Sequence, residues 1–151
     1  MSSTTDTGVR QNLGLLLALA SARATSLAAA EVRPFELSVR SYSLLEHLTQ
    51  HDGVGQRELA TALRLDPSQV VQLVDTLEAR GLAERRPHPS DRRQKSVVAT
   101  VAGHQLYAQV RGPVEATVDA VLADLTPAER ETFAGLLGRI ARPAPATPPP
   151  D

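Results

Sequence analysis

The feature that most constrains this chain is a pair of extended segments separated by a stretch that can continue neither of them. Leu82 to Arg86 and Lys95 to Val101 can each run as a strand, the second because most of its residues are β-branched. The stretch between them contains Pro87 and Pro89, followed by serine and aspartate, and this composition favours a turn. The sequence therefore predicts a β-hairpin with a protruding tip.

The same hairpin concentrates positive charge. Six of the 16 lysines and arginines lie between residues 80 and 95, although the formal net charge of the 151-residue chain is only -1. They are Arg80, Arg85, Arg86, Arg92, Arg93 and Lys95. A narrow ribbon with arginines at its tip suits contact with phosphates and a minor groove, because a guanidinium stays charged and donates to two oxygens at once. Taken alone, the stretch is equally compatible with a solvated charged loop.

Two short helices are predicted directly before the hairpin. Residues 55–63 carry apolar side chains at helical spacing, and Asp66 and Pro67 then form the N-cap and first position of a second helix. That helix runs to about Arg80, and Gly81 ends it. Its buried stripe consists of Val70, Leu73, Val74 and Leu77. This arrangement is a helix-turn-helix.

The second of these helices also has a polar face. Its polar residues in the first three turns are Ser68, Gln69, Gln72 and Thr76. A recognition helix presents residues at these positions to base edges in a major groove. An ordinary surface helix also turns polar residues outward, but the basic hairpin that follows at once favours contact with DNA.

These segments resemble a known family. RELATAL at residues 57–63, followed by LDPSQVVQLVDTLEARGLAERRPHPSDRRQKSVVATVAG at residues 65–103, is similar to the DNA-binding domain of the MarR (multiple antibiotic resistance regulator) family of bacterial repressors. The resemblance extends over about residues 12–141, and LVDTLEARGL and DRR are its most specific parts. It implies a mainly α (α+β) fold, a winged helix-turn-helix with long N- and C-terminal dimerisation helices that works as a homodimer.

The resemblance also implies how DNA is bound. Two recognition helices would enter major grooves about 34 Å apart on a pseudo-palindromic operator. Asp91 and Arg93 correspond to the acidic and basic pair of the wing, where the aspartate would hold an arginine and Arg93 or Arg92 would enter the minor groove. The predicted DNA-binding residues are Ser68, Gln69, Gln72, Thr76, Arg85, Arg86, His88, Asp91, Arg92, Arg93 and Lys95.

One position departs from the family pattern. Family members often carry a basic residue in the middle of the recognition helix, and this chain has Gln72 there. The change removes one phosphate or guanine partner per subunit. Because glutamine pairs with adenine through two hydrogen bonds, we expect A·T pairs where Gln69 and Gln72 reach the operator.

A small-molecule effector is implied by the resemblance alone. The family typically holds a phenolic or aromatic carboxylate compound between the dimer helices and the DNA-binding lobe, and binding there would favour a lobe spacing that does not fit DNA. The implied lining residues are Arg40, Tyr42, His47 and Tyr107, with the arginine for a carboxylate. Each of them could equally be an ordinary interface residue. The predicted protein is thus a ligand-responsive repressor with no resident cofactor.

Length and composition agree with one domain. With 151 residues, of which 42% are hydrophobic, the chain can bury a single core. Helices are expected over residues 9–32, 35–51, 102–125 and 126–141, with a kink at Gly112-Pro113. The predicted division is a disordered tail over residues 1–8, a winged-helix domain over 9–141, and a disordered Pro-rich tail over 142–151. Within the domain, the DNA-binding lobe covers about 53–101 and the dimerisation helices about 9–32 and 102–141.

Other classes of protein fit less well. No nucleophile with a neighbouring base and no phosphate-binding Gly-rich loop is present in the sequence, so an enzyme is not expected. His47 and His51 have acceptable spacing for two metal ligands, and His104 could join them, but no cysteine or adjacent pair of carboxylates completes a site. The absence of cysteine also excludes sensing through a thiolate. A winged helix that binds protein without binding DNA is the remaining alternative.

The cytoplasm is the expected location. The N-terminus lacks the basic start and apolar core of a signal peptide. Leu13 to Ala22 comes nearest to a membrane span, and Arg23 interrupts it before it reaches the roughly 18 uncharged apolar residues that a span needs. We therefore expect a buried amphipathic helix there.

Overall fold

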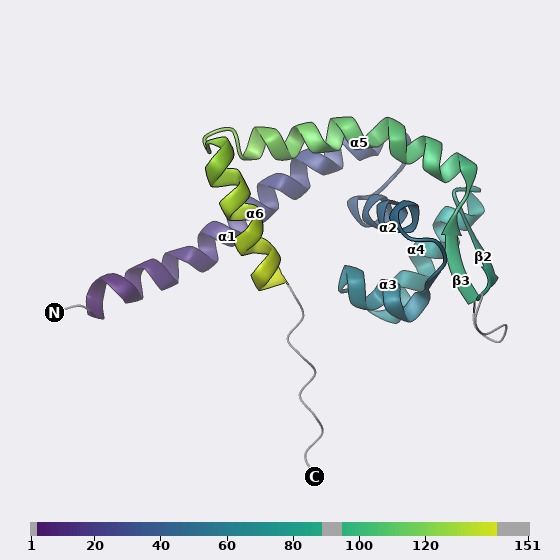
Figure 1. Cartoon of the computed structure of the whole chain (residues 1–151), viewed down its shortest axis with the longest axis horizontal. Helices are drawn as coiled ribbons and strands as arrows, with labels where there is room; N and C mark the ends of the chain where they lie inside the picture. The colour runs from purple at the N-terminus through teal and green to yellow at the C-terminus, as the bar shows by residue number, and fades with distance from the viewer. Residues whose placement is uncertain (1–2, 89–94, 142–151) are drawn as a thin grey trace, which may run out of the picture.

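The computed structural model describes residues 3–88 and 95–141. Over these residues the chain forms six α-helices, a short 3₁₀ helix and a three-stranded sheet, in the order shown in Figure 1. A lobe made of α2, α3, α4 and the sheet lies at one end, and the long helices α1, α5 and α6 extend away from it (Figure 1). The mainly helical winged helix-turn-helix predicted from the sequence is confirmed.

The long helices precede or follow the lobe in the sequence, and α1 and α5 pack side by side. α1 (Ser3–Val32) lies against α5 (Val101–Val121), and α6 (Pro127–Ala141) turns back from the end of α5 (Figure 1). α1 begins at Ser3 rather than at Val9, so residues 3–8, for which a tail was predicted, continue the helix. α5 continues through Pro113 and ends before the predicted Leu125. The predicted tail over residues 142–151 lies outside the described residues.

The second helix starts later than predicted. The sequence suggested Phe35, but a 3₁₀ helix occupies Arg33–Phe35 and α2 spans Val39–Gln50. Glu36 takes a left-handed conformation with φ 55°, which breaks the helical path. Ser38 then caps α2, because its Oγ accepts a hydrogen bond from the Ser41 amide at 3.0 Å. Apolar periodicity alone did not reveal this turn.

The helix-turn-helix is confirmed. α3 (Gln56–Leu63) ends at Arg64, which adopts a left-handed conformation, and α4 (Pro67–Ala79) follows with Pro67 in its first turn. The backbone amide of Asp66 donates to Gln69 Oε1 at 3.2 Å, which is one half of the predicted capping box. Gly81 lies beyond the end of α4 with φ 69°, in the left-handed region that glycine accepts without strain.

The sheet contains the predicted hairpin and one strand that was not predicted. β2 (Ala83–Pro87) and β3 (Lys95–Ala99) pair antiparallel, with Arg85 opposite Val97. β1 (Val54–Gly55) pairs with the other edge of β3, so the strand order is β1-β3-β2. Two residues are too few to give an alternating pattern, which is why β1 left no signal in the sequence.

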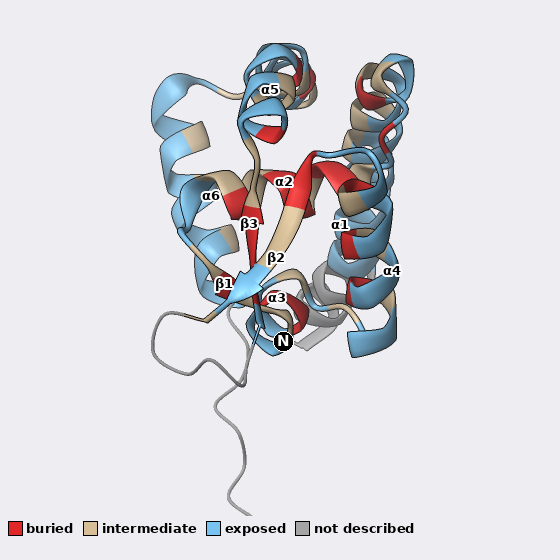
Figure 2. Ribbon diagram, turned by 90° about the vertical axis from the view of Figure 1, so that its right-hand side faces the viewer, coloured by how far each residue is buried: buried red, intermediate tan, exposed pale blue. Residues whose placement is uncertain are grey.

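The core lies inside the lobe. Its fully buried side chains are mainly aliphatic. Those from α2, α3, α4 and β3 are Leu44, Leu45, Leu59, Val70, Val74, Leu77 and Val97, and Val32, Val54 and Val110 from α1, β1 and α5 pack with them. Figure 2 shows this buried material between the lobe helices and the sheet, whereas most of α6 is exposed. The start of α5 is pinned to the lobe through Thr100, whose amide donates to the Leu82 carbonyl at 3.1 Å and whose Oγ1 donates to the Gly81 carbonyl at 2.6 Å.

The long helices leave apolar side chains uncovered in the single chain. Leu13, Leu15, Leu16, Leu17 and Leu19 of α1 and Leu136 and Ile140 of α6 are all exposed. Among the described residues, one stretch is long and apolar enough to cross a membrane, Asn12–Phe35, with a mean hydropathy of 1.6. This stretch contains Arg23, which the sequence analysis took as the interruption of its run of uncharged apolar residues. A helix that packs against a second helix meets the same criteria of length and composition.

Candidate nucleic-acid interface

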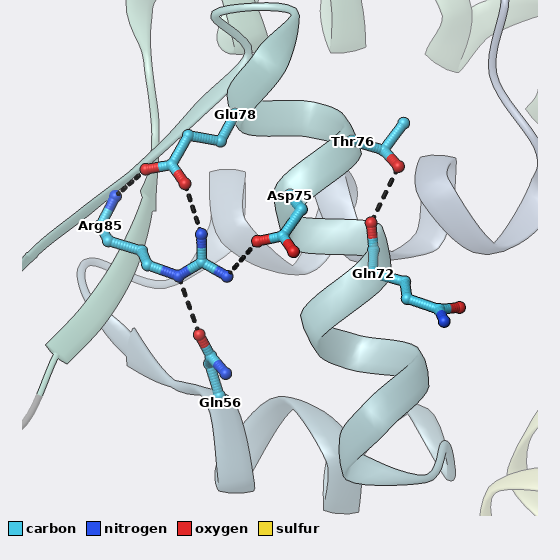
Figure 3. A network of polar contacts seen from close by, with 6 residues as sticks. All are labelled: Gln56, Gln72, Asp75, Thr76, Glu78 and Arg85. Atoms are coloured by element: carbon cyan, nitrogen blue, oxygen red, sulfur yellow. Dashed lines mark hydrogen bonds and ion pairs between the residues drawn. The ribbon is translucent and has the colours of Figure 1, made fainter.

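The polar face of α4 lies on the surface of the lobe. Ser68, Gln72 and Thr76 are exposed, and Gln69 is half-buried because its Oε1 is engaged by the Asp66 amide. Thr76 donates from Oγ1 to the Gln72 carbonyl at 2.8 Å, so its hydroxyl is held against its own helix (Figure 3). The Gln72 side chain extends away from α4 in the same view. Gln72 is thus the best placed of the four to reach a ligand outside the protein.

A hollow of about 410 Å³ separates α4 from the start of α2. Its lining is largely polar and consists of Glu36, Ser38, Arg40, Ser41, Gln69, Gln72, Leu73 and Thr76. Arg40 therefore lies beside the recognition-helix residues. The sequence analysis placed Arg40 with the effector, but the structure puts it on the other side of α2 from Tyr42, because the two residues are only two positions apart on a helix.

Arg85 does not behave as the sequence suggested. Its guanidinium is bound by the carboxylates of Asp75 and Glu78 on α4 and by the side-chain oxygen of Gln56 on α3 (Figure 3). The Asp75 contact measures 2.6 Å and the Gln56 contact 3.0 Å. The side chain is only 18% exposed. This geometry argues against Arg85 as a direct DNA contact, because all three guanidinium nitrogens are engaged inside the protein and two carboxylates lie beside them.

Two other basic residues of the hairpin are exposed. Arg86 pairs with Glu84 on its own strand, and Lys95 lies at the start of β3. His88 is half-buried just after β2. Asp91, Arg92 and Arg93 lie outside the described residues. Arg86 and Lys95 thus remain the described cations of the hairpin that can meet a phosphate.

Arg80 joins two elements that are distant in sequence. It lies at the C-terminal end of α4 and donates to the carbonyls of Glu36 at 2.8 Å and Phe35 at 2.9 Å. These carbonyls belong to the turn between α1 and α2. Arg80 is therefore a structural residue that holds the end of α4 against this turn.

The two predicted effector tyrosines do come together. Tyr42 on α2 and Tyr107 on α5 stack with ring centroids 5.8 Å apart, and Tyr107 donates from its hydroxyl to Glu46 at 3.1 Å. Burial raises the pKa of both phenols, and nearby Glu46 adds to the effect in each case. Both groups are therefore neutral hydrogen-bond donors at physiological pH. The cation next to this pair is Arg111 on α5, and Arg40 is not part of it.

His47 lies apart from the tyrosines. Its ring stacks on His51 with centroids 4.2 Å apart, and its Nε2 is buried without a hydrogen-bond partner. Burial lowers the pKa of His47, and the neighbouring His51 lowers it further. His51 and His104 line a separate hollow between α2 and β3. Across residues 3–88 and 95–141 no group of three or more histidine, cysteine or acidic side chains is arranged to hold a metal ion.

The residues that sequence reasoning missed are the partners of Arg85. Asp75 and Glu78 are three residues apart, so they share one face of α4, and both lie within ten residues of the wing arginine along the chain. Two carboxylates on the flank of a recognition helix repel phosphates. That spacing was the available signal that a nearby arginine is used internally.

Comparisons with known proteins agree with this geometry. Residues 37–95 match the model of the MarR family. A putative transcriptional regulatory protein for the hcr operon of Thauera aromatica is 36% identical over 107 residues, which cover 71% of this chain and 64% of that relative. The match thus spans less than two thirds of the relative's length.

Two solved structures are similar over nearly the whole chain. CouR from Rhodococcus jostii RHA1, crystallised with p-coumaroyl-CoA, superposes with a TM-score of 0.83 at 34% identity and covers 92% of this chain and 98% of its own. A MarR family transcriptional regulator from Rhodococcus sp. RHA1 gives a TM-score of 0.82 at 32% identity, with coverage of 95% and 100%. By its sequence, its fold and these relatives, the chain belongs to the MarR family of transcriptional regulators.

Proposed function

We propose that this protein is a homodimeric, sequence-specific DNA-binding regulator that represses transcription from a pseudo-palindromic operator and is released by a small effector. The observation that carries the proposal is the surface on which the exposed polar face of α4 adjoins a hairpin with the outward cations Arg86 and Lys95. A helix with polar side chains suits base edges in a major groove, and cations beside it suit the flanking phosphates. Among the described residues of the hairpin, Arg86, Lys95 and His88 stay candidate contacts.

The exposed apolar residues of α1 and α6 support the dimer. Leu13, Leu16 and Leu19 of α1 are each more than half exposed in the single chain, and Ile140 of α6 is 66% exposed. A hollow between the end of α5 and α6 is lined mainly by apolar side chains, among them Leu125, Phe133 and Leu136. Exposed apolar surface of this extent marks an interface. A second copy would cover it and would place two recognition helices on one face.

The effector site is proposed at the Tyr42 and Tyr107 pair. The pair lies where α2 of the lobe meets α5, so a compound bound there touches both parts of the molecule. Two aromatic rings and a neutral phenol donor suit a phenolic compound, and Arg111 can approach its carboxylate or another anionic group. The similarity to a regulator crystallised with p-coumaroyl-CoA supports an effector of this type. The known relatives are regulators rather than enzymes, and we propose a cytoplasmic location for this chain.

Binding to duplex DNA as a function of salt tests the proposal. With DNA from upstream of the protein's own coding region, neutralisation of about 6 to 10 phosphates would lower the affinity roughly 10³ to 10⁵-fold between 50 and 200 mM salt. A protein-binding winged helix would give no salt-dependent shift with duplex DNA, and that result would refute the proposal. Addition of aromatic acids and their CoA thioesters to the complex then tests for release.

Arg86→Ala and Arg111→Ala are a matched pair of variants for this experiment. Their side chains are 61% and 57% exposed, and each pairs with one glutamate on its own element. Arg86 lies on the wing, whereas Arg111 lies on α5 outside the lobe. We expect Arg86→Ala to weaken binding to all sequences and to reduce the salt dependence, and Arg111→Ala to leave effector-free binding unchanged. Equal effects of the two variants would indicate nonspecific electrostatics.

A further inference from the structure

We infer that Arg85 is a positioning residue for DNA recognition. It fixes the wing, which is the hairpin of β2 and β3, to the recognition helix α4, so that the two elements bind DNA as one unit. This inference rests on the proposed DNA-binding function, to which Arg85 contributes without touching DNA. Asp75, Glu78 and Gln56 are its partners, and together with Arg85 they are named the wing clamp.

The wing clamp connects all three elements that would surround the DNA. Arg85 comes from β2, Asp75 and Glu78 come from α4, and Gln56 is the first residue of α3 (Figure 3). Nη2 of Arg85 donates to Asp75, Nη1 donates to Glu78, and Nε donates to Gln56. Each nitrogen of the guanidinium therefore has an acceptor inside the protein. Nη1 and Nη2 each keep a second N–H, but the two carboxylates beside them repel a phosphate.

Glu78 also fixes the backbone of the wing. Its Oε1 accepts a hydrogen bond from the Arg85 backbone amide at 3.1 Å, while its other oxygen accepts from the guanidinium. The Arg85 amide and side chain are thus both attached to one carboxylate of α4. Charge-assisted bonds of this kind are roughly twice as strong as neutral ones. These bonds fix the position of β2 relative to the recognition helix α4.

The charge of the wing clamp points the same way. One guanidinium faces two carboxylates, so the cluster carries a net negative charge and does not attract phosphates. The neighbouring Arg86 differs from Arg85 in its exposure and in the charges around it, because successive side chains on a strand point to opposite faces. Arg86 is 61% exposed, and its carboxylate partner among the described residues is Glu84. β2 therefore uses one arginine inward for position and one outward for contact.

Removal of single carboxylates gives a test, because direct DNA contact by Arg85 and a positioning role of Arg85 predict opposite changes in DNA affinity. Glu78 and Glu84 each pair with one wing arginine, and their side chains are 38% and 42% exposed. If Arg85 contacts DNA, Glu78→Ala frees a cation and should tighten binding. If Arg85 positions the wing, Glu78→Ala should weaken binding by about tenfold although a negative charge has been removed, with the salt dependence unchanged. The control Glu84→Ala should leave binding unchanged or tighter.

Duplex DNA selected by the wild-type protein from a random-sequence library serves as the probe. Hydroxyl-radical footprints of Glu78→Ala should lose protection at the minor-groove positions of the wing and keep it where α4 lies. A general loss of folding would remove both protections together and is checked by circular dichroism and by the mass of the dimer. Arg85→Lys is the second variant, because lysine keeps the charge but cannot join three acceptors in a plane. We expect it to weaken binding several-fold, as Glu78→Ala does.

The outcomes separate this inference from the function on which it rests. Should the wild-type protein bind no selected duplex, the proposed function fails and the positioning role fails with it. Should the wild-type protein bind while Glu78→Ala binds as tightly or more tightly, in line with Glu84→Ala, the inference alone is overturned. Full retention of binding by Arg85→Lys would overturn it as well.

Discussion

A single methyl group at Gly103 should destabilise the protein strongly. Gly103 is buried in the first turn of α5, and a Cβ built on it would lie 2.1 Å from the Leu82 carbonyl oxygen and 3.2 Å from Leu45 Cδ1. The oxygen cannot easily move away, because it accepts the hydrogen bond from the Thr100 amide. The first turn of α5 and Leu82, which directly precedes β2, must therefore separate by about an ångström, or the hydrogen bond between Thr100 and Leu82 must break.

The expected magnitude follows from two destabilising terms and one stabilising term. Overpacking of a tight site costs about 1 to 3 kcal/mol, and loss of the Thr100 bond adds about 1 kcal/mol. Replacement of glycine by alanine inside a helix returns about 1 kcal/mol. We expect Gly103→Ala to lose about 1 to 3 kcal/mol of the free energy of unfolding. For a chain of this length that corresponds to a fall of several degrees in Tm, at about 2 to 4 °C per kcal/mol.

Thermal and urea unfolding at one fixed protein concentration measure this loss, since a dimer's Tm depends on concentration. Gln105→Ala is the control, because Gln105 is exposed in the same first turns of α5 and should change stability by no more than about 0.5 kcal/mol. A Gly103→Ala protein as stable as wild type would refute the close approach of α5 to Leu82.

Two further predictions concern the dimer and pH. Leu16→Arg on α1, where the side chain is 53% exposed in the single chain, should turn the dimer into monomers in sedimentation velocity, and an unchanged dimer would contradict the proposed interface. Burial, with His51 nearby, lowers the pKa of His47, so the folded state disfavours its imidazolium. Stability should therefore be intact above about pH 6.5, the ordinary histidine value, and fall as the pH drops below it. His47→Gln should reduce this fall, and parallel pH curves for the two proteins would exclude the explanation.

Much of the fold could be predicted because local signals agreed with one another. Pro67 after Asp66 marked the start of α4, Gly81 marked its end, and Pro87 marked the end of β2 to within one residue, and each signal acts through backbone conformation alone. The start of α2 was misplaced because the left-handed turn at Glu36 depends on contacts from elsewhere, including Arg80. A non-glycine residue in that conformation has no sequence signature.

The candidate site was harder to predict for the same reason. A run of basic residues does not reveal which of them face outward, and Arg85 and Arg86 look alike until the pleat of β2 and the carboxylates of α4 are placed. The resemblance grouped Tyr42 with Tyr107, and the two rings do stack on each other. It also grouped Arg40 with them, but Arg40 is two positions from Tyr42 on α2 and therefore faces the other side of that helix.

Arg80 donates two hydrogen bonds to the carbonyls of Phe35 and Glu36, and this pair of bonds is called the Arg80 fork. The fork sets a threshold for transmitting motion between the dimer helices and the DNA-binding lobe of each subunit. A change in the angle at which α1 leaves the lobe must either carry the C-terminal end of α4 along or break this fork. A hydrogen bond with one charged partner contributes about 1.5 to 3 kcal/mol, so breaking the fork requires a free energy comparable to the 1 to 3 kcal/mol by which effectors typically change affinity. A swing of α1 that is too gentle to break the fork therefore reorients α4 directly, without passing through the sheet.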